Sequence, residues 1–247
     1  MAKKPLHIDP IQILTFPFRD QNWLKKLLIS SLLVFFSFIP VFPIVLLLGY
    51  AAEIIRRIAV DHESPTLPEW DDLGAYFNQG IRLFGVAVVY LIPAILLTGF
   101  GYLGMLFPVI LTEIVGMAET EALVFIIAGN LVGFGFMGLG VMVSMVTGLF
   151  LPVSGTHAVV SQDFKSAFRF KEIWSIFKAN WGGFIIVFLI MIGSAFVLYY
   201  LTYILAATVI LCCLYPFALC FMSAYLILIG AGYFGNAYRE ALLELPD

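Results

Sequence analysis

The residues that could do chemistry form small groups, and the first group is acidic. Five carboxylates lie close together in the sequence: Asp61, Glu63, Glu69, Asp71 and Asp72. Carboxylate oxygens are preferred ligands of Ca²⁺ and Mg²⁺. The spacing lacks the regular alternation of a calcium-binding loop, so we interpret this segment as a solvated loop and predict no metal site.

Histidine is the second candidate. The chain has His7, His62 and His157, and His157 follows Pro152 at the end of an apolar stretch, where an imidazole could ligate a metal, haem or chlorin. The run Ser154-Gly-Thr-His157 suggests a Ser–His pair, but no carboxylate or oxyanion-hole motif accompanies it. We therefore predict that the protein is not an enzyme and has no cofactor, with a cofactor role for His157 left open.

Glycine and amide residues form the third group. One apolar stretch contains Gly129, Gly133 and Gly138 together with Asn130. Small residues four apart let two membrane helices approach closely, so we predict that these glycines pack against another helix. An intramembrane amide is costly unless it is satisfied, so the alternative is that Asn130 lines a polar path.

The rest of the composition is typical of a membrane protein. Of 247 residues, 62% are hydrophobic and 12% are charged, whereas soluble domains have about 25% charged residues. The cysteines, Cys212, Cys213 and Cys220, lie in one apolar stretch, and we interpret them as packing residues. No run of Lys and Arg is dense enough to bind nucleic acid.

Four uncharged stretches mark the expected membrane segments. They cover residues 27–52, 83–112, 122–156 and 179–238, and a single crossing needs about 20 residues. The last stretch is long enough for two crossings with a turn near 205–208. The first is interrupted by Pro40 and Pro43, which leaves a kinked crossing or a short hairpin as alternatives.

The basic residues favour the hairpin. Thirteen Lys and Arg cluster in 3–26, 56–82 and 165–178 and at Arg239, while 113–121 is acidic. Basic loops stay in the cytoplasm. A first hairpin places every Lys and Arg on the cytoplasmic side, so we predict that both termini are cytoplasmic.

Short motifs indicate an internal repeat of three hairpins, at about 22–58, 81–153 and 181–238. Aromatic and amide residues precede each: Phe18-Arg-Asp-Gln-Asn-Trp23, Tyr76-Phe-Asn-Gln-Gly80 and Phe177-Lys-Ala-Asn-Trp181. Segments 6–20, 65–80 and 161–178 are expected to lie in the membrane interface. The predicted interfacial anchors are Trp23, Trp70, Trp174, Trp181, Arg56 and Arg239.

These motifs resemble those of a known family. Gly49-Tyr50 with Arg56-Arg57, Leu67-Pro68-Glu69-Trp70 and the closing Gly232-Tyr233 with Arg239 are similar to prokaryotic membrane proteins grouped as domain of unknown function 4013. The resemblance covers most of the chain. It implies a multi-helix domain in a prokaryotic plasma membrane and supplies no activity.

The sequence thus predicts an all-α, polytopic transmembrane bundle of about six spans, with residues 1–247 as a single domain. Transport usually leaves ionisable groups within the spans, and residues 83–112, 122–156 and 179–238 contain no Asp, Glu, Lys, Arg or His. We therefore predict a non-enzymatic scaffold or accessory subunit that contacts lipid, copies of itself or other membrane subunits. The alternative is a small permease or channel with a path between hairpins.

Overall fold

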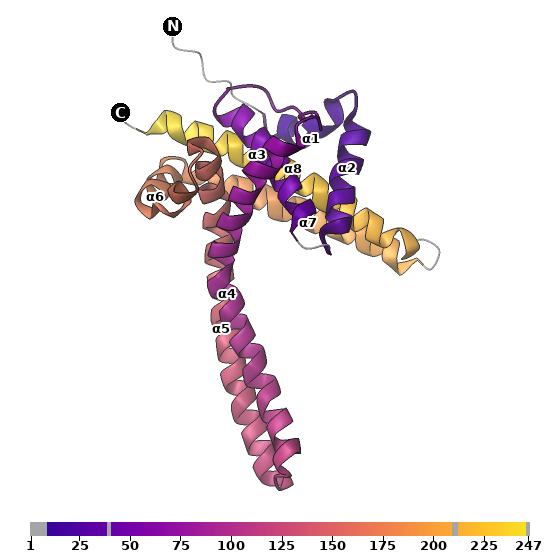
Figure 1. Cartoon of the computed structure of the whole chain (residues 1–247), viewed down its shortest axis with the longest axis vertical. Helices are drawn as coiled ribbons and strands as arrows, with labels where there is room; N and C mark the ends of the chain where they lie inside the picture. The colour runs from indigo at the N-terminus through magenta and orange to yellow at the C-terminus, as the bar shows by residue number, and fades with distance from the viewer. Residues whose placement is uncertain (1–8, 39–40, 209–211, 246–247) are drawn as a thin grey trace. The chain divides into compact units, whose positions relative to one another are not determined.

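The computed structural model describes residues 9–38, 41–208 and 212–245, and within them the chain is helical with no strand. The predicted all-α class is confirmed at this level. The helices are α1 (Pro10–Arg19), α2 (Trp23–Phe35), η1 (Phe36–Phe38), α3 (Phe42–Ala59), α4 (Leu73–Val115), α5 (Glu119–Ser161), η2 (Phe164–Phe168), α6 (Phe170–Ala179), α7 (Trp181–Ala207), η3 (Cys212–Leu214) and α8 (Tyr215–Glu244) (Figure 1).

The chain divides into two compact units. One consists of residues 1–86 and 152–247, and the other of residues 87–151. The first unit therefore contains α1–α3, α6–α8, the beginning of α4 and the end of α5. The second unit contains the remaining parts of α4 and α5.

Helix α8 is the centre of the first unit. It contacts α1, α2, α3, α6 and α7. Small residues in its second half make these contacts close: a Cβ at Gly232 would meet Ile13 of α1, and one at Gly235 would meet Ile55 of α3. The glycines thus replace side-chain bulk with backbone contact at the points where α1 and α3 lie on α8.

Helix α3 is mostly buried, and its glycine motif contacts α4. A Cβ at Gly49 would overlap the carbonyl group of Tyr76, and a Cβ at Gly80 would overlap that of Val45. The Gly49-Tyr50 and Asn78-Gln79-Gly80 motifs therefore face each other where two backbones touch. Elsewhere along α3, apolar side chains such as Leu47 and Ile54 are buried.

The segment around the two prolines does not form one continuous helix. Helix α2 ends at Phe35, α3 begins at Phe42 with Pro43 in its first turn, and α2 contacts α3. Proline suits a first helical turn because its missing N–H would have no partner there. Pro40 lies outside the described residues.

Four described helices are long and apolar enough to cross a membrane: α4, α5, α7 and α8. The expected count of about six exceeds this number. Helix α2 has only 13 residues, and α3 has 18 and carries Glu53, Arg56 and Arg57. Helix α7 ends at Ala207, within the segment where the sequence predicted a turn.

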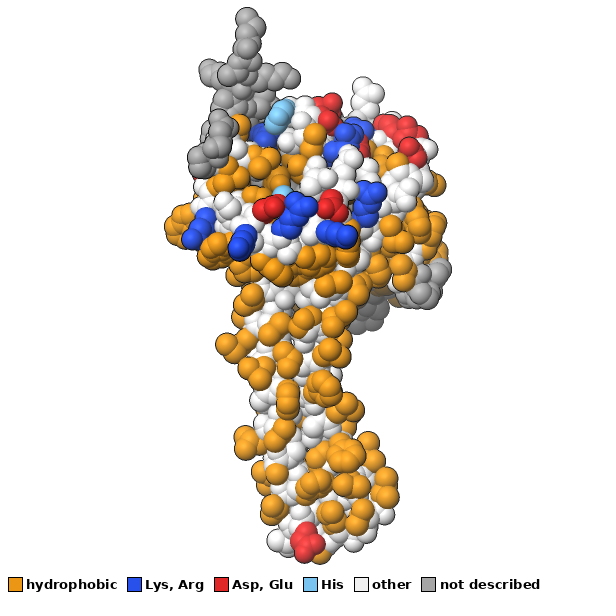
Figure 2. Space-filling view, turned by 60° about the vertical axis from the view of Figure 1, so that its left-hand side comes forward, with side chains coloured by type: hydrophobic (Ala, Val, Ile, Leu, Met, Phe, Trp, Pro, Cys, Tyr) orange, Lys and Arg blue, Asp and Glu red, His pale blue; other side chains and the backbone are white. Residues whose placement is uncertain are grey.

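The second unit is a pair of antiparallel helices. Gly101 and Gly104 of α4 face Gly133 of α5, and Pro108 faces Gly129, so partner numbers fall as α4 numbers rise. Its outer surface is hydrophobic, with acidic side chains at one end (Figure 2). In the most apolar windows of α4 and α5, only 11% and 6% of residues are buried within the chain.

Candidate functional site

Two of the three predicted packing glycines lie at the α4–α5 contact. A Cβ on Gly133 would come within 2.7 Å of the Gly101 carbonyl oxygen, and one on Gly129 within 2.8 Å of that of Gly104. A Cβ on Gly138 would meet nothing within 4 Å. The reason is helical periodicity: five residues turn the helix by about 500°, which places Gly138 about 140° away from Gly133.

The amide of Asn130 is used within its own helix. Its side-chain nitrogen donates to the Ile126 carbonyl oxygen at 2.9 Å, and the side chain is half-buried. This bond satisfies part of the amide locally, so the side chain does not depend on a polar path for a partner.

The predicted interfacial anchors occupy different environments. Trp174 and Trp181 are 47% and 62% exposed, and Trp23 packs edge-on against Phe18. Two others are covered by neighbouring residues. Arg239 is only 4% exposed, inside the first unit, and Trp70 stacks on buried Tyr50 with ring centroids 4.1 Å apart.

Tyrosine and lysine side chains hold the acidic segment against the helices. The Tyr50 hydroxyl donates to the Pro68 carbonyl at 2.7 Å, and the Tyr76 hydroxyl donates to that of Glu69. Buried Lys26 binds carboxylate oxygens of Asp20 at 2.8 Å and Glu69 at 2.6 Å. Among the described residues, no three His, Cys, Asp or Glu side chains form a group that could hold a metal ion. The Glu69 carboxylate thus helps to hold this segment in place through its contact with Lys26.

Burial and pairing have opposite effects on the ionisation of this cluster. Burial alone would lower the pKa of Lys26, but hydrogen bonds to Asp20 and Glu69 outweigh it and raise that pKa above its usual 10.5. Burial alone would raise the pKa of Asp20, but the Lys26 contact and the Asn22 amide hold it below its usual 3.8. Both groups are therefore charged near neutral pH.

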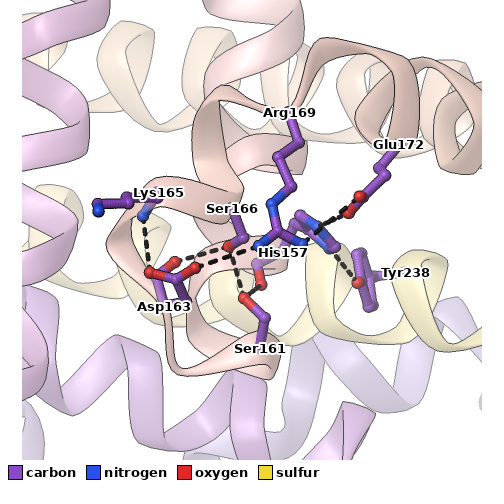
Figure 3. Close-up of polar contacts among 8 residues, drawn as sticks. All are labelled: His157, Ser161, Asp163, Lys165, Ser166, Arg169, Glu172 and Tyr238. Atoms are coloured by element: carbon purple, nitrogen blue, oxygen red, sulfur yellow. Dashed lines mark hydrogen bonds and ion pairs between the residues drawn. The ribbon is translucent and has the colours of Figure 1, made fainter.

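A second polar network surrounds His157 (Figure 3). Its Nδ1 lies 2.7 Å from the Tyr238 hydroxyl of α8, and its Nε2 lies 3.2 Å from a Glu172 carboxylate oxygen of α6. An ionised carboxylate only accepts, so Nε2 carries the proton and, in neutral imidazole, Nδ1 accepts from Tyr238. Arg169 extends the network, at 3.5 Å from both Glu172 and Asp163.

Glu172 therefore supplies a carboxylate beside His157, which the sequence did not predict. It lies 15 residues further along the chain, on α6. Ser154, the other half of the suspected pair, is fully buried. In this arrangement His157 links three helices, α5, α6 and α8, and its side chain is only 12% exposed.

A cavity of about 280 Å³ lies in the first unit among α3, α4 and the end of α5. Its polar lining consists of two arginines and three amides: Arg56, Arg82, Asn78, Gln79 and Gln162. The Arg82 Nη1 donates to the Gln162 carbonyl at 3.0 Å. Sequence reasoning did not assemble this site, although the Asn78-Gln79-Gly80 motif and Arg82 lie next to each other in the chain.

Arg56 is held in the cavity wall by two carboxylates. It lies 2.8 Å from Glu53 and 2.9 Å from Asp61, and Arg57 also pairs with Glu53 at 3.0 Å. Burial alone would raise the pKa of Glu53, but the hydrogen bonds from Arg56 and Arg57 outweigh it and keep that pKa below its ordinary value. The guanidinium of Arg56 is thus held in position by the side chains of Glu53 and Asp61.

Comparison with known proteins gives one family. The family described as protein of unknown function (DUF4013) matches residues 32–207, which confirms the resemblance found in the sequence. The match runs from within α2 to the end of α7 and leaves out α8, the central helix of the first unit. No curated protein and no solved structure matches the chain.

Proposed function

The chain belongs to the DUF4013 family, and we propose that it is a non-enzymatic integral membrane protein, a scaffold or accessory subunit that packs against other membrane proteins or lipid. The observation that carries this proposal is the exposed apolar surface of α7. Only 11% of its most apolar window is buried, against 50% for α8. A face of this kind is covered in a bilayer by lipid chains or by helices of another subunit.

Aromatic residues on α7 support a full crossing. Exposed Trp181 begins the helix, and exposed Tyr200 lies 19 residues later, which is about 28 Å at 1.5 Å per residue. The hydrocarbon core of a bilayer is about 30 Å thick, and Trp and Tyr gather at its two interfaces. The spacing therefore fits one aromatic residue at each interface.

We propose a topology in which α4–α5 and α7–α8 cross as hairpins, while α2–α3 enters and leaves on one side as a third, shorter hairpin. Residues 87–151 contain no Lys or Arg, and their charged residues are Glu113, Glu119 and Glu121. Basic residues are retained in the cytoplasm. This topology gives cytoplasmic termini in a prokaryotic plasma membrane.

The polar side chains also support a scaffold. Four tyrosine hydroxyls, those of Tyr50, Tyr76, Tyr225 and Tyr233, donate to backbone carbonyls of the same chain. Asn130 is likewise bonded within α5. These groups hold short segments in place, and the exposed apolar helices remain as the surface offered to partners.

Photo-cross-linking in native membranes tests the proposal. A photoreactive phenylalanine analogue at Phe196, which is 72% exposed on α7, should form adducts with a second copy or another membrane subunit. Phe188 is the matched control, because it packs edge-on against Phe234 of the same chain, with ring centroids 5.4 Å apart. It should give no intermolecular product.

Reconstitution separates this proposal from a permease. Purified protein in liposomes should pass neither ions nor small solutes. A reproducible flux that disappears in Asn130→Leu would overturn the scaffold proposal, because it would place this amide on a conduction path. Failure of cross-linking at Phe196, with lipid adducts alone, would contradict the protein-partner role.

A further inference from the structure

We propose that the cavity lined by Arg56, Asn78, Gln79, Arg82 and Gln162 binds a phosphate ester, and that an anionic phospholipid headgroup supplies it in the membrane. The chemistry of the lining carries this assignment. Two arginines and three residues with side-chain amides line the cavity, and no Asp or Glu is among its lining residues. Guanidinium forks bind phosphate oxygens through paired, charge-assisted hydrogen bonds.

The two arginines have different roles. Arg56 is bonded to Glu53 and Asp61, so its position is fixed and much of its charge is balanced. Arg82 donates from Nη1 to the Gln162 carbonyl, an uncharged acceptor. That contact orients the Arg82 guanidinium without neutralising it, and Arg82 is the exposed member of the pair. Arg82 therefore supplies the charge that attracts an anion.

Gln79 narrows the class of ligand. Its side-chain oxygen is buried and has no hydrogen-bond partner in the described structure. A buried acceptor without a donor is unfavourable. A phosphate ester that also carries a hydroxyl group, such as a glycerol phosphate headgroup, supplies both the anion for Arg82 and the donor for Gln79.

The place of the cavity along the chain agrees with a headgroup, and this step rests on the proposed topology. Arg82 is the last charged residue before the uncharged part of α4, and Gln162 follows the end of α5. In a helix pair that crosses the bilayer, these positions fall at the boundary between hydrocarbon and water, where lipid phosphates lie. The volume of about 280 Å³ suits a headgroup rather than acyl chains.

The test measures lipid binding to the purified full-length chain. In nanodiscs of phosphatidylcholine, added phosphatidylglycerol should bind and raise the thermal unfolding temperature. Arg82→Gln should weaken this binding about tenfold, as expected for loss of a charge-assisted contact. Arg169→Gln is the matched control, since Arg169 is also an exposed arginine near the end of α5 but does not line the cavity. It should bind as the wild type does.

Two further arms identify the source and guard against misfolding. Glycerol 3-phosphate added to the detergent-solubilised protein tests a soluble ester. Glycerol 3-phosphate could stabilise the wild type but not Arg82→Gln, while phosphatidylglycerol stabilises neither protein. The cavity would then bind a phosphate ester, but the lipid source would be wrong. The wild type should bind phosphatidylglycerol, whose headgroup carries hydroxyl groups, more tightly than phosphatidic acid. Gln79→Leu should fold stably and lose this preference.

The proposed site would be overturned if Arg82→Gln bound both phosphatidylglycerol and glycerol 3-phosphate as tightly as the wild type does. Cross-linking at Phe196 does not involve the cavity, so a failure here is distinguishable from a failure of the scaffold proposal. If Arg82→Gln does not fold, Arg82→Lys takes its place. Lysine keeps the charge but loses the fork, so binding should fall below that of the wild type, by less than tenfold, and unchanged binding would contradict the role of the guanidinium.

Discussion

At the scale of single residues, the polar side chains of the first unit act mainly on their own backbone. The Tyr50 hydroxyl holds Pro68, the Tyr225 hydroxyl holds Leu14, and Lys26 holds the Leu67 carbonyl at 3.0 Å as well as two carboxylates. The three bonds to backbone carbonyls join residues 18, 211 and 41 positions apart. These polar groups can be buried because each donor has a hydrogen-bond partner.

Replacement of Lys26 should therefore destabilise the first unit. Lys26→Met keeps the length of the side chain but leaves Asp20 without its cation, and Glu69 is released. Breaking a buried pair costs several kcal/mol and an exposed pair less than one. Because Glu69 is 64% exposed, we expect a loss of roughly 1–3 kcal/mol. Thermal unfolding in detergent, followed by tryptophan fluorescence, measures it.

The same pair predicts a pH dependence. The pKa of Asp20 is lowered in the folded state, so its stabilising contribution is present above about pH 4 and is lost as the pH falls through the folded value. The wild type should lose more stability on acidification below pH 4 than Lys26→Met does. Parallel curves for the two proteins would show that the Asp20–Lys26 contact contributes nothing.

At the scale of elements, the contact between α4 and α5 depends on glycine position rather than on glycine number. Gly129 and Gly133 lie against α4, and Gly140 lies against Thr98, which continues the contact seven residues beyond Gly133. Seven residues are close to two helical turns, so Gly140 returns to the same face whereas Gly138 does not.

A matched pair of substitutions tests this contact. Gly133→Leu should lower the stability of the protein in detergent, because a Cβ there already collides with Met105 and the Gly101 carbonyl. Gly138→Leu introduces the same side chain on the same helix into open space and should leave stability unchanged or slightly higher. Melting temperatures compare the two. Equal loss in both variants would argue against the α4–α5 contact described here.

Periodicity explains why some of this could be read from the sequence and some could not. The spacing of Gly129 and Gly133 is a local signal, and it predicted two of the contact residues. The amide of Phe177-Lys-Ala-Asn-Trp181 is also local: Asn180 caps α7 by accepting from the Gly183 amide at 3.0 Å. The contact of His157 with Tyr238 joins residues 81 positions apart, and no spacing rule connects them.

The exposure of the predicted anchors also depends on contacts between residues far apart in the sequence. Trp and Arg are residue types that are common at membrane interfaces, but the exposure of Trp70 and Arg239 depends on their neighbours in space. Trp70 is stacked on Tyr50, 20 residues earlier. Arg239 lies in the buried half of α8 and donates from Nη2 to the side-chain oxygen of Asn236 at 2.6 Å. The packing of α8 against its neighbours determines the exposure of Arg239.

At the scale of the whole molecule, the charge distribution gives the sharpest prediction about orientation. Glu119 is the first residue of α5, directly after the turn that follows α4, and the loop after α3 contains Glu63. If α4 and α5 cross the membrane as proposed, these positions lie on opposite sides. All thirteen Lys and Arg then share the side of Glu63.

Single cysteines at these two positions test the orientation, in a chain whose own Cys212, Cys213 and Cys220 are replaced by alanine. An impermeant thiol reagent applied to intact cells should label Glu119→Cys and leave Glu63→Cys unlabelled, because only the first faces outward. After permeabilisation both should react, which shows that the thiol at position 63 is accessible and was protected by the membrane. Labelling of position 63 but not 119 in intact cells would invert the topology, and it would place every Lys and Arg of the chain outside the cell, against the retention of basic loops in the cytoplasm.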